Sequence, residues 1–258
     1  DSPTRWREAV AAAASWGQLE ESAWPVGQDA AFAASLARRY VTVGGIVNAI
    51  RDSVRDHMTV AASLRPLAAD SPLAESHGTT YPIVQGAMTR VSDRASFAAE
   101  VAEGGALPFL ALALLRANEV ETLLDETAQL LGDKPWGVGI LGFVPQDLRD
   151  EQLEVVRRKL PRFALIAGGR PDQAHELEEL GIATYLHVPS PGLLKQFMDD
   201  GSRRFVFEGR ECGGHVGPRS SFVLWESMIE TLLEVIPLRE AQRFHVLFAG
   251  GVHDALSS

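Results

Sequence analysis

The sequence FALIAGGRPDQAHELEELGIATYLHV, from Phe163 to Val188, contains one complete strand–helix–strand unit. Its two apolar runs, Phe163 to Ala167 and Thr184 to Val188, have the length and composition of buried strands. Between them, Asp172 to Leu180 has helical spacing, and Pro171 followed by Asp172 is a helix start signal. A short strand, a crossover helix and a second short strand indicate two parallel neighbours in one sheet.

The same alternation extends in both directions, from Tyr81 to the end of the sequence. The further strand candidates are Ile83 to Gln85, Leu107 to Leu112, Gly137 to Leu141, Phe205 to Phe207 and His245 to Ala249. The further helix candidates are Ser92 to Glu103, Asn118 to Leu131, Asp147 to Leu160, Pro191 to Asp200 and Ser221 to Val235. Seven such units favour an α/β TIM-type (β/α)8 barrel over an open doubly wound sheet. Since an eighth unit does not follow, we expect a barrel truncated after its seventh strand.

Residues 1–70 follow a different pattern and predict a helical appendage. Helical spacing is found in Trp6 to Ala14, Asp29 to Arg39 and Ile46 to Met58. The segment from Ala61 to Thr80 has two prolines and no clear period, so we expect a linker there. The predicted organisation is therefore an appendage over residues 1–70 and an incomplete barrel over residues 81–258.

Composition excludes several classes of protein. The apolar fraction of 46% and the charged fraction of 22% are those of a globular domain. A net charge of -10 argues against a broad nucleic-acid or anionic-membrane surface, and no apolar run approaches the ~20 residues of a membrane span. Cys212 is the single cysteine, which fits a reducing cytoplasm and leaves no cysteine-cluster metal site. Because residue 1 is Asp, we expect a piece of a longer, multidomain chain.

Glycines recur in the loops that follow the predicted strands, which is the face where barrels of this type bind ligands. They include Gly86, the pair Gly168-Gly169, and the pair Gly250-Gly251 after the last strand. Several glycines on one rim suggest a ligand that lies against the backbone. For Gly250-Gly251, a phosphate site and an ordinary turn with positive φ both remain open.

The longest of these loops is EGRECGGHVG, Glu208 to Gly217, which holds Gly213, Gly214 and His215. His215 is the titratable group that we expect beside the ligand. Cys212 invites a Cys/His nucleophile interpretation, but neighbouring residues at a strand end point apart, so we expect a packed side chain. His187, at the end of the fifth strand, either faces the ligand or is a satisfied core histidine. The remaining histidines show no metal-ligand pattern, and we expect Glu208 and Glu211 to position the loop or the histidine.

Four motifs, in order and at the right spacing, resemble one family. EGRECGGHVG is similar to the GxEAGGHxG signature of the nitronate monooxygenase (2-nitropropane dioxygenase) group, which includes flavin-dependent enoyl-ACP reductases. PIVQGAM (Pro82 to Met88), GGALP (Gly104 to Pro108) and FAGGV (Phe248 to Val252) resemble its first-strand, turn and phosphate-loop motifs. Ala87 replaces the usual proline of the first motif.

The resemblance implies a TIM-type barrel with noncovalent FMN. By that resemblance, the flavin ring lies beside Gln85, Gly86, Ala87 and Met88, and beside Gly213 and Gly214. Further candidate contacts are His187 and Gly139, the latter at a position that is polar in many members. Gly250 and Gly251 hold the phosphate, and His215 is the catalytic residue. No metal is implied.

The resemblance suggests two enzymatic functions, and the missing eighth unit with the altered contact positions motivates a third, non-catalytic one. LHVPS, Leu186 to Ser190, is similar to the enoyl reductase version, and the extended loop resembles domains embedded in polyketide or polyunsaturated-fatty-acid synthases. The leading hypothesis is an enoyl-thioester reductase that uses NAD(P)H and takes a substrate carried, for example, on an acyl carrier protein. The alternatives are a nitronate monooxygenase and a non-catalytic scaffold domain.

Overall fold

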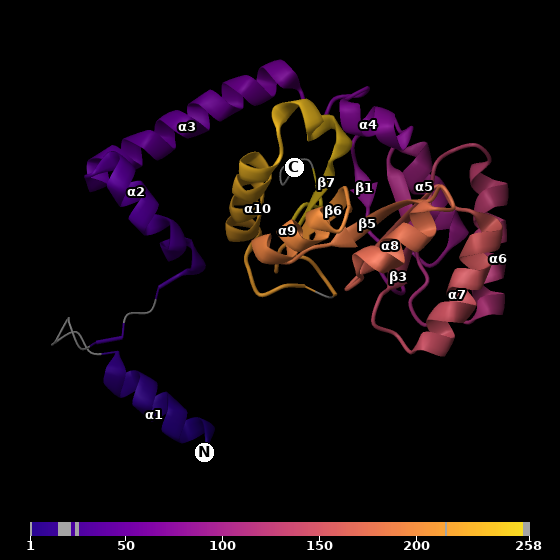
Figure 1. The fold of residues 1–258 in the computed structure, drawn as a ribbon, viewed down its shortest axis with the longest axis horizontal. Helices are drawn as coiled ribbons and strands as arrows, with labels where there is room; N and C mark the ends of the chain where they lie inside the picture. Colours follow the sequence, from indigo (N-terminus) through magenta and orange to yellow (C-terminus); the bar gives the residue numbers. More distant parts are fainter. Residues whose placement is uncertain (1, 15–21, 24–25, 215, 255–258) are drawn as a thin grey trace. The chain divides into compact units, whose positions relative to one another are not determined.

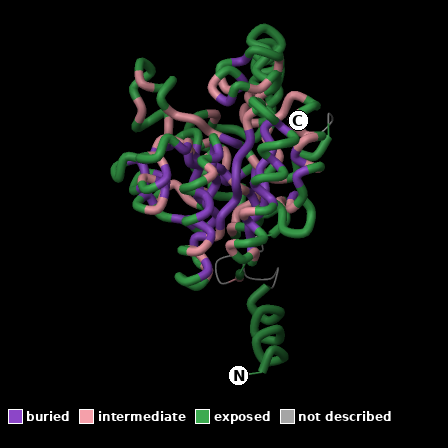
Figure 2. The backbone as a smooth tube through the Cα atoms, turned by 90° about the vertical axis from the view of Figure 1, so that its right-hand side faces the viewer, coloured by how far each residue is buried: buried purple, intermediate pink, exposed green. Residues whose placement is uncertain are grey.

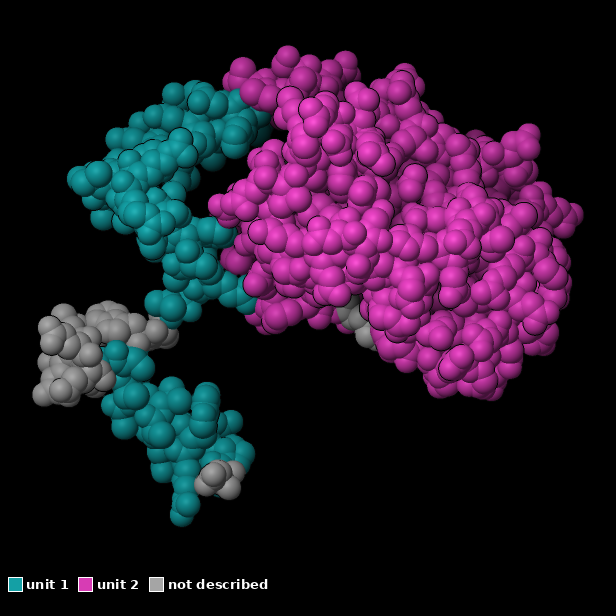
Figure 3. Space-filling view, viewed as in Figure 1, with its two compact units in different colours: residues 1–58 teal, residues 59–258 magenta. Residues whose placement is uncertain are grey.

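The computed structural model describes residues 2–14, 22–23, 26–214 and 216–254. Two compact units divide the chain, one over residues 1–58 and the other over residues 59–258 (Figure 3). The first unit is helical in its described part. Its elements are α1 (Pro3–Ala13), the 3-10 helix η1 (Gln28–Phe32), α2 (Ala33–Tyr40) and most of α3 (Val43–Leu64).

The second unit is built from alternating parallel strands and helices, as the sequence predicts (Figure 1). Its strands are β1 (Val84–Gln85), β2 (Leu107–Ala111), β3 (Gly137–Leu141), β4 (Phe163–Ala167), β5 (Ala183–His187), β6 (Arg204–Glu208) and β7 (His245–Ala249). Its helices are α4 (Pro72–His77), α5 (Ala95–Glu103), α6 (Ala117–Leu131), α7 (Gln146–Lys159), α8 (Pro171–Glu178), α9 (Pro191–Asp199), α10 (Ser221–Val235) and the 3-10 helix η2 (Leu238–Arg243).

The seven strands pair in chain order, β1 to β7, and every pair is parallel. They form a nearly closed barrel with the helices on its outer side, which confirms the predicted α/β TIM-type fold. Because all strands run the same way, the loops after them meet at one rim. That rim carries every glycine-rich loop named above.

Two hydrophobic clusters follow from the alternation of side chains along each strand. Phe109, Phe163, Leu165, Tyr185 and Val206 belong to the cluster inside the barrel. The residues between them on each strand point outward and pack beneath the helices in a larger cluster. In Figure 2 the buried stretches of the backbone gather in the middle of this unit, and exposed stretches lie around them. At ~25 cal/mol per Å² of apolar area removed from water, these two clusters dominate the stability of the unit.

The expected linker between residues 61 and 80 is partly helical, so this prediction was wrong in part. Helix α3 continues to Leu64, and α4 begins at Pro72 after the extended residue Ser71. It ends at Gly78, which has a left-handed conformation with φ of 72°. Pro at the first helical position and Gly after the last are the ordinary boundaries of a short helix, but six residues are too few for a periodic pattern.

Helix α4 matters because it delivers His77 to the N-terminal end of the barrel. His77 is 1% exposed, and one ring nitrogen is 2.7 Å from the hydroxyl oxygen of Tyr185. Its ring packs edge-on against Phe163, with 5.4 Å between ring centroids. The lower opening of the barrel is therefore closed by packing, and the opposite rim is left for a ligand.

Candidate functional site

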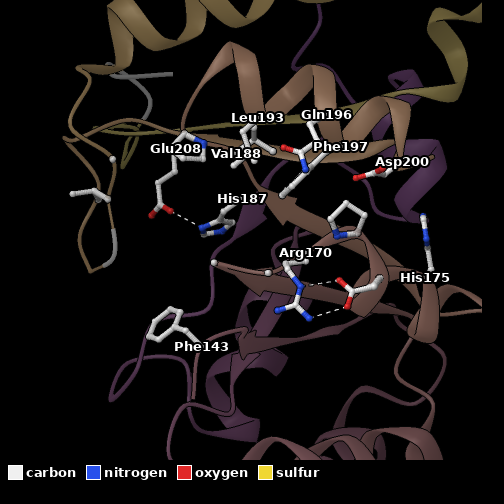
Figure 4. Close-up of a pocket in the computed structure, with 17 residues that line it drawn as sticks. Phe143, Arg170, His175, His187, Val188, Leu193, Gln196, Phe197, Asp200 and Glu208 are labelled. Atoms are coloured by element: carbon white, nitrogen blue, oxygen red, sulfur yellow. Dashed lines mark hydrogen bonds and ion pairs between the residues drawn. The ribbon is translucent and has the colours of Figure 1, made fainter. Parts of the chain in front are cut away.

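A cavity of about 910 Å³ opens at the C-terminal ends of β4, β5 and β6 and extends between α8 and α9 (Figure 4). Its apolar wall includes Phe143, Val188, Leu193 and Phe197. Leu193 and Phe197 are four residues apart and lie on one face of α9, which is why a single short helix supplies much of that wall. A mostly apolar cavity with a few polar groups is the usual form of a small-molecule site.

His187 and Glu208 form a polar pair in the lining of this cavity. They are the last residues of β5 and β6, which are adjacent parallel strands with His187 in register with Val206. Glu208 lies two residues beyond Val206, so both side chains belong to the inward-facing set. Nδ1 of His187 is 2.6 Å from Oε2 of Glu208, and the side chains are 19% and 15% exposed. Such a short contact between partly buried groups is a charge-assisted hydrogen bond.

A second polar pair lies at the start of α8. The guanidinium of Arg170 donates two hydrogen bonds to the carboxylate of Asp172, at 3.0 Å and 2.8 Å. These bonds hold the pKa of Asp172 below its usual range. Arg170 and Asp172 both line the cavity. The carboxylate of Asp172 neutralises the positive charge of Arg170, because the two side chains are bonded to each other.

Cys212 is half-buried, and its thiol donates a hydrogen bond to Glu208. Burial, the negative charge of Glu208 and that hydrogen bond raise the pKa of Cys212 to about 12. At pH 8 about one thiol in ten thousand is then ionised, far too few for a nucleophile. The residue links the glycine-rich loop to Glu208.

Glu211 joins the loops after β6 and β7 to the first turn of α10. Its Oε2 accepts hydrogen bonds from the backbone N–H of Ser221 at 2.7 Å and from the Ser221 hydroxyl at 2.6 Å. These two bonds lower the pKa of Glu211. The carboxylate thus neutralises the positive end of α10, a position that favours an anion. As the sequence suggested, Glu211 positions the loop.

The first-strand motif is held by side-chain contacts. The side-chain amide of Gln85 exchanges hydrogen bonds with the backbone of Phe109, both at 3.3 Å, and also donates to the carbonyl of Gly86. Gln85 therefore extends the β1–β2 ladder, and its role toward a cofactor stays a prediction. The backbone N–H of Met88 donates to the Ser92 hydroxyl at 2.7 Å, which fixes the end of the turn.

Ala87 and Gly139 lie against each other across the top of the barrel. A Cβ added to Gly139 would be 2.0 Å from Cβ of Ala87, so the alanine fills the space above the glycine. Gly139 is buried. The position offers a ligand only the small surface of Ala87, because a larger residue at 139 would not fit.

The glycines of the rim differ in their surroundings. A Cβ at Gly86 or Gly213 would meet nothing within 4 Å, whereas Gly214, Gly250 and Gly251 have φ values of 81°, 138° and 75° that favour glycine. Among the described residues, no partner accepts from the backbone N–H of Gly250 or Gly251. Open backbone beside a flat ligand and free N–H groups for an anion are what a flavin nucleotide requires, so the rim fits that group.

The structure brings His187 into the cavity, whereas Gln85 to Met88, Gly139, Gly250 and Gly251 lie at other parts of the rim. His215 lies outside the described residues, between Gly214 and the cavity residue Val216. Sequence reasoning did not pair Glu208 with His187, and did not single out Arg170 or Asp172. The first pair could have been found, because both are polar residues at inward positions of neighbouring strand ends.

Two classes of feature do not occur in the described part of the chain. No group of three His, Cys, Asp or Glu side chains gathers there in a way that would hold a metal ion. None of its helices combines the length and the hydropathy that crossing a bilayer requires.

Comparison with known proteins decides the family. Residues 70–256 match the model of the nitronate monooxygenase family. The chain belongs to that family. The match begins just before α4, so it covers the whole seven-stranded barrel of this family member.

The individual proteins that resemble this chain do so at low sequence identity. A curated (3aS,4S,5R,7aS)-5-hydroxy-7a-methyl-1-oxo-octahydro-1H-indene-4-carboxyl-CoA dehydrogenase of Rhodococcus jostii (strain RHA1) is 28% identical over 185 residues, which are 70% of this chain and 48% of that protein. Among solved structures, FabK from Thermotoga maritima has a TM-score of 0.62 at 25% identity, over 72% of this chain and 55% of that one. The enoyl reductase domain of MlnA from the macrolactin biosynthesis cluster of Bacillus amyloliquefaciens shares the fold, with a TM-score of 0.55 at 16% identity over 74% and 52% of the two chains. The family member described here thus spans about half the length of these relatives.

Proposed function

We propose that this chain belongs to an FMN-dependent oxidoreductase that reduces an α,β-unsaturated acyl thioester, with NAD(P)H as the hydride donor. The observation that carries this proposal is the cavity at the strand ends, with an apolar wall and the His187–Glu208 pair. An acyl chain suits the wall of Phe143, Val188, Leu193 and Phe197. The similarity to a carboxyl-CoA dehydrogenase supports a thioester substrate.

The flavin would be held by the rim residues that the family resemblance indicates. The backbone of Gln85 to Met88 and the glycines 213 and 214 would lie beside its ring, and Ala87 leaves the top of the barrel flat there. Gly250 and Gly251 would donate N–H groups to its phosphate. When bound, FMN supplies two-electron transfer between NAD(P)H and the substrate.

Reduction of the double bond needs a proton as well as a hydride, and a side chain near the substrate can deliver it. His215 follows two exposed glycines and precedes a cavity residue, Val216, so we assign it this proton-handling role. Imidazole is suited to it because it gives and takes a proton near neutral pH. Replacing His215 with Ala should leave flavin binding intact and abolish most turnover. Unchanged turnover would remove His215 from the mechanism.

The experiment that tests the function is anaerobic mixing of the natural protein that contains this sequence with NAD(P)H. A yellow protein whose flavin absorbance is bleached by NAD(P)H and restored by a 2-enoyl-CoA is expected. Bleaching only by an alkyl nitronate would contradict the reductase. A colourless, folded protein would instead favour a non-catalytic scaffold within a larger synthase.

The second candidate is a nitronate monooxygenase, which the family match favours. In that case His215 would assist proton removal from a nitroalkane, and oxygen would be the second substrate. A small nitroalkane would contact only part of the apolar wall, so the size of the cavity favours a thioester substrate. An acyl carrier protein as the donor of that thioester, a place in a multidomain synthase and a cytoplasmic location remain part of the proposal.

A further inference from the structure

The His187–Glu208 pair is built so that one imidazole atom remains for the cavity. Glu208 accepts the Nδ1–H of His187 across 2.6 Å, which fixes the ring plane. No described residue bonds Nε2, the other ring nitrogen, and His187 lines the cavity. In Figure 4 a dashed line joins the His187 ring to the Glu208 carboxylate. Nε2 is therefore the atom that a ligand meets.

The neighbouring charges leave Glu208 to act on His187. Arg170, which lines the cavity, is bonded twice to Asp172. The second partner of Glu208 is the Cys212 thiol, which stays neutral because its pKa is about 12. Among the described residues bonded to the Glu208 carboxylate, His187 is the one that can become a cation, so a positive charge formed on its ring is compensated where it forms.

A purely structural role explains this arrangement poorly. Strands β5 and β6 are already joined by their backbone ladder and by outward residues such as Leu186 and Phe205, both fully buried. A partly buried ion pair adds little net stability, because desolvation of both charges offsets their attraction. A staple between strands would also not need one ring nitrogen open to a cavity.

We propose that His187 is a second proton-handling group of this site, that Glu208 is its positioning residue, and that the ligand is a carbon acid. A carbon acid is a C–H compound activated by a neighbouring thioester carbonyl or nitro group; only the choice between these two rests on the proposed function. The Nε2 lone pair takes the proton as the C–H bond breaks, and the electron pair moves onto the carbonyl or nitro oxygen. The reverse step returns a proton to carbon, and water in the cavity exchanges it.

The test is hydrogen–deuterium exchange without turnover. The natural protein is incubated anaerobically in D2O, without NAD(P)H, with butyryl-CoA in one arm and nitroethane in the other. Deuterium on the carbon beside the activating group is measured by mass spectrometry, above the rate in buffer. We expect exchange by the wild-type protein in one arm, and a loss of about 10²-fold in His187→Gln, the lower range for general acid–base catalysis.

Three further variants keep the result interpretable. His245→Gln is the matched control, since His245 is a half-buried histidine at the opposite end of the barrel, and should exchange normally. Glu208→Gln should slow exchange less than His187→Gln, because the imidazole remains but loses its fixed orientation. Added imidazole should restore exchange in His187→Ala, which a structural role would not permit. Circular dichroism verifies that each variant is folded.

Absence of exchange in both arms, or equal exchange in His187→Gln and wild type, would overturn the proposal. So would loss of exchange in His215→Ala with full retention in His187→Gln. A failure of the proposed function is measured separately, as the absence of NAD(P)H-dependent reduction of a 2-enoyl-CoA. The two failures can therefore be distinguished. Exchange of nitroethane alone would support the proton-handling role of His187 and would identify nitroalkanes, rather than thioesters, as the ligands of the site.

Discussion

At the scale of single residues, His77 shows how burial alters a histidine that the sequence left without a role. Burial first, and then the positive charges of His245, Arg204 and Arg162, lower its pKa to about 4. Its Nδ1 has no hydrogen-bond partner in the described structure. A proton on that atom would be buried without an acceptor, so the folded protein keeps His77 neutral.

This difference predicts a pH-dependent stability. The unfolded chain binds a proton at His77 below about pH 6.5, and the folded protein binds it only below about pH 4. Stability is therefore fully present above pH 6.5 and falls by up to ~3 kcal/mol as the pH drops through this window. In His77→Gln, which can still bond Tyr185, the loss of unfolding free energy between pH 7.5 and pH 5 should be ~2 kcal/mol smaller. Urea unfolding at both pH values measures it.

The control for this prediction is His57→Gln. His57 is an exposed histidine on α3, and the His57→Gln variant is unfolded at the same two pH values for comparison. The same pH dependence in His77→Gln and wild type would contradict the burial argument.

At the scale of elements, one contact holds three segments of the rim together. Ser221, at the start of α10, lies between Gly209 after β6 and Gly250 after β7. A Cβ on either glycine would come within about 2 Å of the Ser221 hydroxyl oxygen, at 2.1 Å from Gly209 and 2.0 Å from Gly250. The first turn of α10 thus sets the position of the two loops that are expected to hold His215 and a phosphate.

A double-mutant cycle tests this junction. Gly250→Ala should destabilise the protein by ~1–3 kcal/mol, from the clash with Ser221 and from the φ value of 138°. Ser221→Ala removes the clashing oxygen, so the double variant should lose less stability than the sum of the single variants. Gly213→Ala is the control and should be nearly neutral, because nothing lies within 4 Å of the added Cβ. Strict additivity in urea unfolding would reject the contact.

At the scale of the whole molecule, the barrel carries its own core. In the described part of the chain, the buried hydrophobic residues all belong to residues 74–247, and α1, α2 and α3 contain no buried residue. Apolar burial is the main source of folding free energy. We propose on this ground that the helical appendage and the barrel are separate domains, with a boundary close to residue 58.

Deletion of residues 1–58 tests that boundary. The remaining chain should fold with a main thermal transition within a few degrees of that of the full sequence, because no core contact is removed. Differential scanning calorimetry on both chains measures it, and near-UV circular dichroism reports whether the barrel aromatics keep their packing. Loss of cooperative unfolding would show that the appendage belongs to the fold of the barrel.

The fold was predictable because its signals are local. Leu107 to Ala111, Phe163 to Ala167 and their counterparts are apolar runs of strand length, separated by helical spacing, and each of the seven predicted strands is present. The glycine-rich loops could be placed at one rim because parallel strands all end there. Helix α4 was missed, since six residues are shorter than two helical turns and carry no period.

What the sequence alone determined about this protein is its barrel and the rim at which its glycine-rich loops meet, because chain order and periodicity decide which strands are neighbours. The four motifs, by their resemblance, indicated its family. The tertiary structure decided which side chains meet. His187 and Glu208 are separated by twenty intervening residues, and only the register of β5 and β6 brings Nδ1 within 2.6 Å of the carboxylate. The same holds for Cys212, whose pKa follows from burial and from the charge of Glu208. Distances and desolvation depend on packing in three dimensions, which no local pattern encodes.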